Sequence, residues 1–394
     1  MRIGRTIPPA AASIGWMDLW NGLRGMCCRD RSLDALEQGI RQHFAVNHVF
    51  LVSSGTAALT LTLEALKTMS PRREVVIPAY TCFCVPAAVL KAGLRPQLCD
   101  IDPSTFDFDD ALLGQTLNGD SLCVIAHHLF GVPSAIERIR NVCEADRIFV
   151  VEDAAQAMGA ESNGRPLGTL GDVGIFSLGR GKNITCGSGG IIVTNSRHIA
   201  ESLDRLYRRL EPPTAYEELK DFVRLVLMAI FIRPWLYWIP AALPFLELGR
   251  TIFPKDIRLA RLSGMKAGVL RNWQSSLVRS NRGRAEAAAD FNRRLSLRAA
   301  QDPARPYVRL PLVVSTPNER ERIYSLSKRR GLGLSTAYPS AINEIPEIRS
   351  SFDGQSFPSA RRLSKNLLTL PTHQWLSQKD MRAISELCRD LSAA

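Results

Sequence analysis

The chain has 394 residues, of which 45% are hydrophobic and 22% are charged. This length is enough for two domains with large buried cores, and this composition excludes a disordered protein. The formal net charge of +12 favours anionic partners such as sugar nucleotides, acidic lipids or nucleic acid. Nucleic acid is the weakest of the three, because the Lys and Arg residues are scattered and form no basic helix.

The cysteines and histidines indicate a reduced protein without a metal. The nine cysteines include no Cys-x-x-Cys pair, and both Cys27-Cys28 and Cys82-x-Cys84 are too close for ordinary disulfides or a zinc site. The six histidines make no ligand pattern, and residues 1–14 contain no apolar run of signal-peptide length. We therefore expect a cytoplasmic chain with no metal and no nucleic-acid partner.

The first half of the chain predicts an irregular start followed by alternating strands and helices. Residues 1–30 are expected to be irregular, with an amphipathic patch at Trp16–Leu23, and Ser32–Phe44 has the apolar spacing of a helix. Six short apolar runs are expected to be buried strands: Val75–Ile77, Leu98–Ile101, Leu122–Ile125, Ile148–Val151, Gly174–Phe176 and Ile191–Val193. Because amphipathic segments separate several of these runs, we expect an α/β fold with a mostly parallel sheet.

The segment 221–248 differs in composition from the rest of the chain. Phe222–Ile232 is nearly all apolar, and the aromatic run Arg233–Pro240 follows it. The uncharged stretch is interrupted by Pro240 and Pro244 and is shorter than the roughly 20 apolar residues that a spanning helix needs. We therefore expect this segment not to cross a bilayer.

The remaining chain predicts a smaller C-terminal α/β domain. An amphipathic helix is expected from Arg261 to about Leu297, then a strand at Tyr307–Val314, a helix at Asn318–Arg330 and a final helix at Gln378–Leu391. These patterns divide the chain into an N-terminal segment, a major cofactor-binding domain, an apolar insertion and a small domain. Their expected ranges are 1–30, 31–215, 216–262 and 263–394.

Lys182 is the most informative residue for function. It lies in a glycine-rich loop, five residues after Ser177, and Asp153 ends the apolar strand before that loop. An enzyme that uses pyridoxal 5'-phosphate needs these three groups. The carboxylate keeps the pyridine nitrogen protonated, the serine helps to bind the phosphate, and the lysine amine holds the cofactor covalently. A single lysine is more often a surface residue, so the prediction depends on the combination.

A second element, Ser54-Gly55-Thr56, is a hydroxyl-rich turn that opens a helix. Its free amides and the helix dipole can hold a phosphate, but a simple N-cap by Ser54 explains the same residues. Asp153 has the same two interpretations, because an aspartate at a strand end can be a cofactor ligand or an N-cap.

Together these motifs resemble the DegT/StrS family of sugar aminotransferases, of the aspartate aminotransferase fold type. The resemblance covers most of the chain. Its markers are Ser54–Leu59, Ile77–Thr81, Asp100–Pro103, His128–Gly131, Glu152–Ala157, Phe176-Ser177 with Lys182, and Leu370–His373. It implies a mostly parallel seven-stranded sheet flanked by helices, which is fold type I of the pyridoxal phosphate transferases, and a homodimer whose sites are completed across the interface.

The resemblance also implies individual roles. Lys182 would hold the cofactor, Asp153 would pair with the pyridinium nitrogen, and Gln156 would lie near the phenolic oxygen. Ser177 and the Ser54-Gly55-Thr56 turn would bind the phosphate. Some relatives have histidine in place of the lysine and are dehydratases, so Lys182 favours an aminotransferase.

Three positions depart from the family pattern. Cys82 stands where an aromatic residue usually stacks on the ring, with Phe83 next to it, and we expect Cys82 to lie over the ring. Ser188 replaces the glutamate of a Gly-Glu-Gly-Gly turn, and Leu259 replaces an asparagine that would reach the partner's phosphate. The changes at Ser188 and Leu259 weaken the expectation of a contact across the dimer.

The apolar segment 221–248 allows two interpretations. Trp235, Tyr237 and Trp238 are residue types that settle at a bilayer surface, and several nearby Arg and Lys residues, up to Arg250, could meet anionic headgroups. The segment would then dock the enzyme on the cytoplasmic face of the membrane. The alternative is a helical hairpin that is buried in the dimer or covers the active site.

The sequence thus predicts a pyridoxal phosphate-dependent aminotransferase that acts on a nucleotide-linked keto-sugar, with glutamate as the expected amino donor. Its product would enter a cell-surface glycan or a glycosylated metabolite. Two alternatives remain at this point: another enzyme of the same fold type, and a non-catalytic or membrane-scaffold relative.

Overall fold

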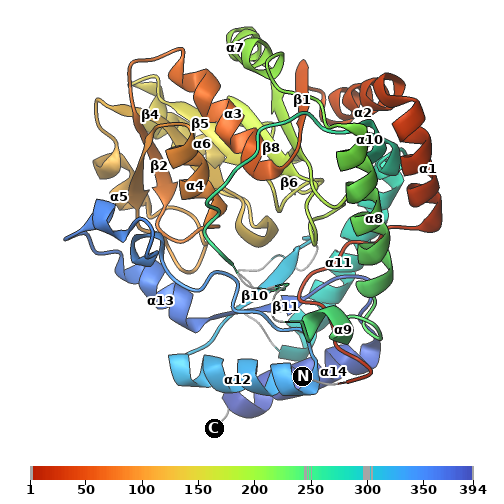
Figure 1. Ribbon diagram of the computed structural model, residues 1–394. Coiled ribbons are helices and arrows are strands. Elements are labelled where there is room, and N and C mark those ends of the chain that lie inside the picture. The colour runs from red at the N-terminus through yellow and green to blue at the C-terminus, as the bar shows by residue number, and fades with distance from the viewer. Residues whose placement is uncertain are drawn as a thin grey trace.

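A seven-stranded sheet forms the centre of the protein in the computed structural model, which describes residues 3–243, 246, 248–249, 251–295, 302 and 305–392 (Figure 1). The strands are β1 (His48–Val52), β2 (Glu74–Pro78), β3 (Arg95–Cys99), β4 (Ser121–His127), β5 (Phe149–Asp153), β8 (Val173–Ser177) and β9 (Gly190–Thr194). Their order is β1-β9-β8-β5-β4-β2-β3, and only β9 runs antiparallel to its neighbours. The predicted α/β fold with a mostly parallel sheet is therefore confirmed.

Successive residues of the strands point into two different hydrophobic cores, as the pleat of a sheet requires. On β9, Ile192 belongs to one core, whereas Ile191 and Val193 belong to the other. The helices α3 (Gly55–Lys67), α4 (Cys84–Lys91) and α7 (Arg197–Tyr207) cover the first face. The second face is covered by α2 (Arg29–Phe44), α5 (Asp110–Thr116), α6 (Ile136–Glu144), α8 (Ala215–Phe231), α10 (Gly264–Val269) and α11 (Trp273–Leu295). Burial on both faces explains why the strands are nearly continuous apolar runs.

The six predicted strands lie at the positions of strands in the structure, and only their end residues differ slightly. The Leu98–Ile101 run is shifted, because β3 ends at Cys99 and Ile101 forms only an isolated bridge with Phe108. The first strand, β1, was not among the six predicted strands. The two-residue strands β6 (Glu161–Ser162) and β7 (Arg165–Pro166) form a separate small hairpin.

The expectation that residues 1–30 are irregular is wrong. Residues Trp16–Cys27 form the helix α1, which packs against α10. The contact is made by glycines: a Cβ added to Gly25 would lie 2.3 Å from the Gly264 carbonyl oxygen, and one added to Gly268 would lie 2.3 Å from the Asn21 carbonyl oxygen. The four glycines in α1 and α10 lower helix propensity but allow the two backbones to approach closely, and that packing decides the structure.

A second, smaller group of elements follows the large sheet. The strands β10 (Arg309–Val313) and β11 (Leu367–Pro371) pair antiparallel, and the helices α12 (Pro317–Arg330), α13 (Pro358–Asn366) and α14 (Gln378–Ser392) lie around them (Figure 1). The predicted helices 318–330 and 378–391 agree with α12 and α14. The single helix expected from Arg261 to Leu297 is two helices, α10 and α11, and residue 297 lies outside the described residues. The division into the ranges 1–30, 31–215, 216–262 and 263–394 stays a prediction, although α1 and α10, from the first and last of these ranges, pack against each other in the core of the large sheet.

The apolar segment forms α8, followed by the short helix α9 (Trp238–Ala241); residues 244, 245, 247 and 250 lie outside the described part. Across the described residues, no helix is long and apolar enough to cross a membrane. Helical spacing gives α8 three distinct faces. The buried face is Glu218, Phe222, Leu225 and Ala229; the outward apolar face is Tyr216, Leu219, Val223 and Leu227; the polar face is Glu217, Lys220, Asp221 and Arg224. This polar face lines a pocket described below.

Candidate active site

The carboxyl ends of β4 and β5 place His127 and Asp153 side by side. The two residues are register partners in the parallel pair, and the His127 Nε2 atom lies 3.8 Å from an Asp153 carboxylate oxygen. Both side chains are buried. Since the carboxyl edge of a parallel sheet is where α/β proteins form their sites, this edge is the first candidate position for chemistry.

The neighbouring carboxylate, Glu152, faces the other side of the sheet and has a structural role. Its oxygens accept hydrogen bonds from His128 at 2.9 Å, from the Gly168 amide at 2.9 Å and from the Gly171 amide at 2.6 Å. Burial alone would raise the pKa of Glu152, yet these hydrogen bonds lower it below its usual value. The alternation of a strand thus leaves Asp153, and not Glu152, for the site.

The Asp153 carboxylate makes a local backbone contact that resembles an N-cap. Its Oδ1 atom accepts a hydrogen bond from the Ala155 amide at 3.1 Å, which is a local turn contact, and no helix follows it directly. The other oxygen faces His127. The carboxylate is therefore held in place by one local bond and still presents an oxygen to the site.

Lys182 lies in the loop between β8 and β9, and its position is fixed through its backbone. The buried Arg284 of α11 donates to the carbonyl oxygens of Lys182 at 3.0 Å, Ala11 at 2.8 Å and Val308 at 2.8 Å. Burial lowers the pKa of Arg284 to about 10, so the group remains charged near neutral pH. Arg284 ties the Lys182 loop to the N-terminal segment and to the start of β10, and the sequence analysis did not identify it.

Asp153 and Lys182 converge on one place. Both charges act on the pKa of the same three side chains, which are those of Cys82, Cys84 and His127. The Lys182 amine makes no hydrogen bond or ion pair within the described residues, and its side chain is half-buried. An unpaired, partly desolvated amine opposite a carboxylate is the arrangement that covalent cofactor binding requires.

Cys82 occupies this convergence, and Phe83 does not. Phe83 is 5% exposed and packs in the core beneath α4, whereas Cys82 is half-buried beside the two charges. A hydrogen bond from Cys84 is the main cause that lowers the pKa of Cys82 to about 7, against the opposing effect of burial. The Lys182 charge adds to the lowering. The position next to a cofactor ring would therefore be filled by a small, partly ionised thiol.

His127 and Gln156 extend the site toward the C-terminal elements. Burial lowers the pKa of His127 to about 4, so the ring is neutral near pH 7 despite the nearby Asp153. Its Nδ1 atom is hydrogen-bonded to the Thr81 hydroxyl, and the Gln156 amide nitrogen lies 3.4 Å from Nε2. Gln156 also donates to the Tyr338 hydroxyl at 3.0 Å. The Gln156 Oε1 atom is buried without a hydrogen-bond partner in the described residues, which leaves one polar position open to a ligand.

His127 and Tyr338 were not predicted. His127 had a usable signal, because it follows the expected strand Leu122–Ile125 in the way that Asp153 follows its own strand. Tyr338 had none, since it lies 182 residues after Gln156 in a turn where Ala337 has a positive φ of 55°. Only the packing of the small domain against the sheet brings Tyr338 to the site.

The start of α3 forms a cradle of small residues. Ser54 is the N-cap of α3, and its hydroxyl accepts from the Ala57 amide at 3.0 Å, so the simple capping interpretation holds for this side chain. A Cβ added to Gly55 would lie 3.0 Å from the Ser177 Cβ and 3.1 Å from its hydroxyl oxygen. Gly55 therefore keeps an opening between the helix N-terminus and Ser177. An opening lined by amides and a hydroxyl fits a phosphate group.

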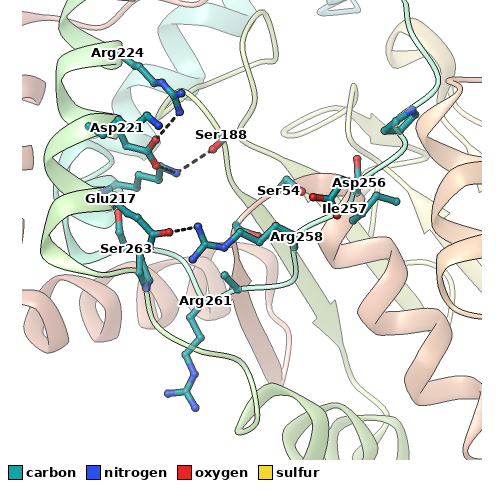
Figure 2. Close-up of a pocket in the computed structure, with 17 residues that line it drawn as sticks. Ser54, Ser188, Glu217, Asp221, Arg224, Asp256, Ile257, Arg258, Arg261 and Ser263 are labelled. Carbon is teal, nitrogen blue, oxygen red and sulfur yellow. Dashed lines mark hydrogen bonds and ion pairs between the residues drawn. The ribbon is translucent and has the colours of Figure 1, made fainter.

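Beside this cradle lies a pocket of about 360 Å³ that contains neither Asp153 nor Lys182 (Figure 2). It shares Ser54 and Thr56 with the cradle, and the polar face of α8 forms its opposite wall. We place the candidate chemistry at Asp153 and Lys182, because the buried amine of this pocket, that of Lys266, is already paired with Asp221 at 2.7 Å. Leu259, expected to weaken a contact across a dimer, packs against the core.

The architecture defines the class first: the fold is that of the aminotransferase structures to which it is similar. It matches PseC of Helicobacter pylori with a TM-score of 0.80 over 99% of this chain and 100% of that chain, at 16% identity. It matches DesI, crystallised in the presence of its TDP-sugar product, with a TM-score of 0.78 over 99% and 94%, at 20% identity. A GDP-4-keto-6-deoxy-D-mannose-3-dehydratase of Escherichia coli has the same fold, with a TM-score of 0.77 over 98% of this chain and 100% of that one, at 18% identity. The fold alone therefore does not separate transamination from dehydration.

The sequence comparisons give the family. Residues 24–210 match the sequence model of the DegT/DnrJ/EryC1/StrS aminotransferase family. It is 31% identical to GDP-perosamine synthase of Vibrio cholerae over 45% of this chain and 48% of that protein. It is 25% identical to a pleiotropic regulatory protein of Geobacillus stearothermophilus over 89% and 87% of the two chains. The matched stretch spans about half the length of the first of these relatives, and the predicted resemblance to this family is confirmed.

Proposed function

We propose that the protein is a pyridoxal phosphate-dependent aminotransferase that moves an amino group from an amino acid to a nucleotide-linked keto-sugar. The observation that carries this proposal is the convergence of Lys182 and Asp153 on one buried site at the carboxyl edge of the sheet. Relatives with names such as GDP-perosamine synthase support a nucleotide-sugar substrate. The product would enter a surface glycan or a glycosylated metabolite.

Pyridoxal phosphate, when bound, supplies an electron sink for the carbanion that forms when a substrate Cα loses its proton. Asp153 would hold a positive charge on the ring nitrogen, which strengthens that sink. The Lys182 amine would hold the cofactor covalently and, after release, would carry a proton to and from the substrate carbon. His127, being neutral, would orient Gln156 and would not compete with the ring nitrogen for the Asp153 charge.

The remaining residues would bind and position the cofactor. The Gly55 and Thr56 amides at the N-terminus of α3 and the Ser177 hydroxyl would bind the phosphate, while the Ser54 hydroxyl stays a helix cap. Gln156 would face the phenolic oxygen, where its unpaired Oε1 atom indicates an open polar position. Cys82 would lie against the ring face. The small groups at Cys82 and Gly55 leave the room that a planar ring with a phosphate arm needs.

The test is the visible absorption of the protein after addition of pyridoxal phosphate. We expect a band that borohydride removes and that Lys182→Ala lacks, with Arg180→Ala as a matched control because Arg180 is exposed two residues away. A protein that binds the cofactor equally well with and without Lys182 would contradict the proposal. If neither the wild type nor the variant binds the cofactor, the non-catalytic scaffold interpretation is favoured.

The amino donor is tested separately. We propose glutamate, whereas two relatives are named as transferring the amino group of L-glutamine to 2-deoxy-scyllo-inosose. Single-turnover bleaching of the cofactor band with glutamate and with glutamine identifies the donor. A panel of keto-sugar nucleotides then restores the band if the acceptor is correct, and a failure of every keto-sugar with a competent donor would favour another reaction of the same fold type.

We further propose a homodimer that associates with the inner face of the cytoplasmic membrane through α8 and α1. The outward face of α8 and the residues Trp16, Met17, Trp20 and Leu23 of α1 are exposed and apolar, and the two helices are in contact. Lys220 and Arg224 border the α8 stripe on its polar side.

Flotation with vesicles that contain anionic lipid separates the two uses of this surface. We expect Leu219→Ser/Val223→Ser to remain with the unbound fraction, whereas Val278→Ser, an equally exposed change on α11, still floats. Light-scattering mass measurement of the same variants tests the dimer. A double variant that becomes monomeric but has unchanged flotation would show that the stripe is a subunit interface and would remove the membrane proposal.

A further inference from the structure

The pocket of about 360 Å³ beside α3 has a polar wall that the proposed catalytic residues do not use (Figure 2). Its volume lies within the range of small-molecule sites. One side is the start of α3 with Ser53, Ser54 and Thr56; the other side is the polar face of α8. Because Glu217, Lys220, Asp221 and Arg224 recur at helical spacing, they all point to the same side of α8.

The two acidic residues of this wall are already neutralised by basic partners. Glu217 forms an ion pair with Arg258, which reaches across the pocket in Figure 2 and holds the pKa of the Glu217 carboxyl at about 2. Asp221 lies 2.7 Å from the ammonium of Lys266, whose other contact is the Ser188 hydroxyl at 2.9 Å. These two carboxylates therefore position cations. Asp256 is a third carboxylate that lines the pocket, and the five basic lining residues outnumber the three acidic ones.

The remaining groups favour an anion. Lys220 has no acidic partner within the described residues. An Arg224 guanidinium nitrogen lies 3.5 Å from an Asp221 carboxylate oxygen, which is a weak ion pair. Arg261 turns away from the pocket and stacks over Tyr207, so it adds long-range charge only. On the opposite side, the N-terminal amides of the 13-residue helix α3 face the same space.

We propose that this pocket binds the diphosphate of the nucleotide-linked substrate, with Arg258 and Lys220 as its principal ligands. The inference rests on the proposed function and adds a binding site for the substrate's anionic part. The pocket shares Ser54 and Thr56 with the phosphate cradle, so a diphosphate here lies next to the cofactor's phosphate end and leaves the Asp153 and Lys182 side free. The inserted helix α8 would then be a substrate-binding wall.

Isothermal titration of the pyridoxal phosphate-treated protein with inorganic pyrophosphate tests the site at low salt. We expect one site per chain and a loss of affinity of about ten-fold or more in both Arg258→Ala and Lys220→Ala, because hydrogen bonds to charged groups contribute on that order. Glu217→Gln removes a negative charge and should tighten binding several-fold. Arg279→Ala removes an equal charge from an exposed position on α11 and should leave the affinity unchanged.

Two further arms make the result decisive. The first arm measures the binding of UDP, GDP and dTDP. The proposal is supported if one of them binds at least as tightly as pyrophosphate and loses the same affinity in Lys220→Ala. It is overturned if none of the three binds. Competition between pyrophosphate and pyridoxal phosphate would also overturn the proposal, since the pocket would then be part of the cofactor cradle. Equal losses in Lys220→Ala and Arg279→Ala, or no binding by the wild type, would overturn it as well.

Lys182→Ala separates this inference from the proposed function. The variant should keep its pyrophosphate affinity while losing the cofactor band. A wild-type protein that binds pyrophosphate as expected but never binds the cofactor would contradict the proposed function alone, and the reverse pattern would contradict the pocket alone.

Discussion

The two polar regions of this protein are built in opposite ways. Asp153 and His127 lie at the ends of buried parallel strands, where the strand register makes them neighbours. The polar region of the pocket belongs to α8. One of the other two faces of this helix is buried in the core, and the other is apolar and exposed. The first region is determined by sheet geometry, and the second by which way a single helix is rotated.

This difference matters for the interpretation of the apolar segment 221–248. Its composition predicted either a membrane-docking element or a hairpin that is buried in the dimer or covers the active site. In the structure the first part of this segment belongs to α8, which packs into the core through Leu225, exposes Leu219 and presents Lys220 to a pocket. The three faces of α8 can therefore serve different roles, and each role can be tested by substitutions on one face.

The largest expected effect is at the sheet edge. Lys182→Ala should lower transamination by roughly 10²–10⁴-fold, because it removes the group that moves the proton, and Lys182→Arg should not restore it. Single-turnover rates with the identified donor measure the loss. Near-normal rates in Lys182→Ala would contradict the assignment of Lys182, whatever the cofactor spectrum shows.

On α8, two leucines give a matched comparison. Leu225 is 2% exposed and packs against Gly187, so Leu225→Ala should lower the free energy of unfolding by about 2–5 kcal/mol. Leu219 is 55% exposed, so the same substitution there should change it by under about 0.5 kcal/mol. Urea unfolding of both variants checks the rotation of α8. Similar losses at the two positions would mean that the outward stripe is covered in solution.

Acid should destabilise the folded state through two buried histidines. Burial lowers the pKa of both His127 and His373 to about 4, below the usual value near 6.5. Between pH 6.5 and 4 the unfolded chain takes up these protons and the folded chain does not, so stability falls as the pH falls. The loss amounts to about 3 kcal/mol for each residue and stops below pH 4.

His373→Gln isolates one of these contributions, since a glutamine can still donate to the Pro8 carbonyl oxygen that accepts from His373 at 2.8 Å. Urea midpoints measured from pH 7.5 to pH 4 should fall less steeply in this variant. His198→Gln, an exposed control, should leave the slope unchanged. An equal slope in wild type and His373→Gln would show that His373 is protonated in the folded state.

The smallest effect concerns the thiol at the site. Alkylation of Cys82 should accelerate with a midpoint near pH 7, because the hydrogen bond from Cys84 lowers its pKa to about 7. The measurement uses a Cys27→Ser/Cys28→Ser background, which removes the two exposed thiols. Cys84→Ala should move the midpoint upward, and an unmoved midpoint would show that Cys84 is not the cause.

Much of the fold was predictable because its signals are local. The buried strands are short apolar runs, and the glycine and hydroxyl residues around Lys182 and Ser54 identify the family by order and spacing alone. Helix α1 was missed because its packing through Gly25 against Gly264 and Gly268 depends on a partner 240 residues away in the chain, and no local propensity reports such a contact.

By itself the sequence determined the α/β class, the family and the set of residues from which a site would be built, since these depend on periodicity and on motifs within short stretches. The tertiary structure alone decided that Asp153 and Lys182 face the same cysteine pair, that Tyr338 and Arg284 reach them from distant segments, and that α8 turns charges toward a pocket. Those outcomes depend on how elements pack, and packing energy is shared among residues that lie far apart in the chain.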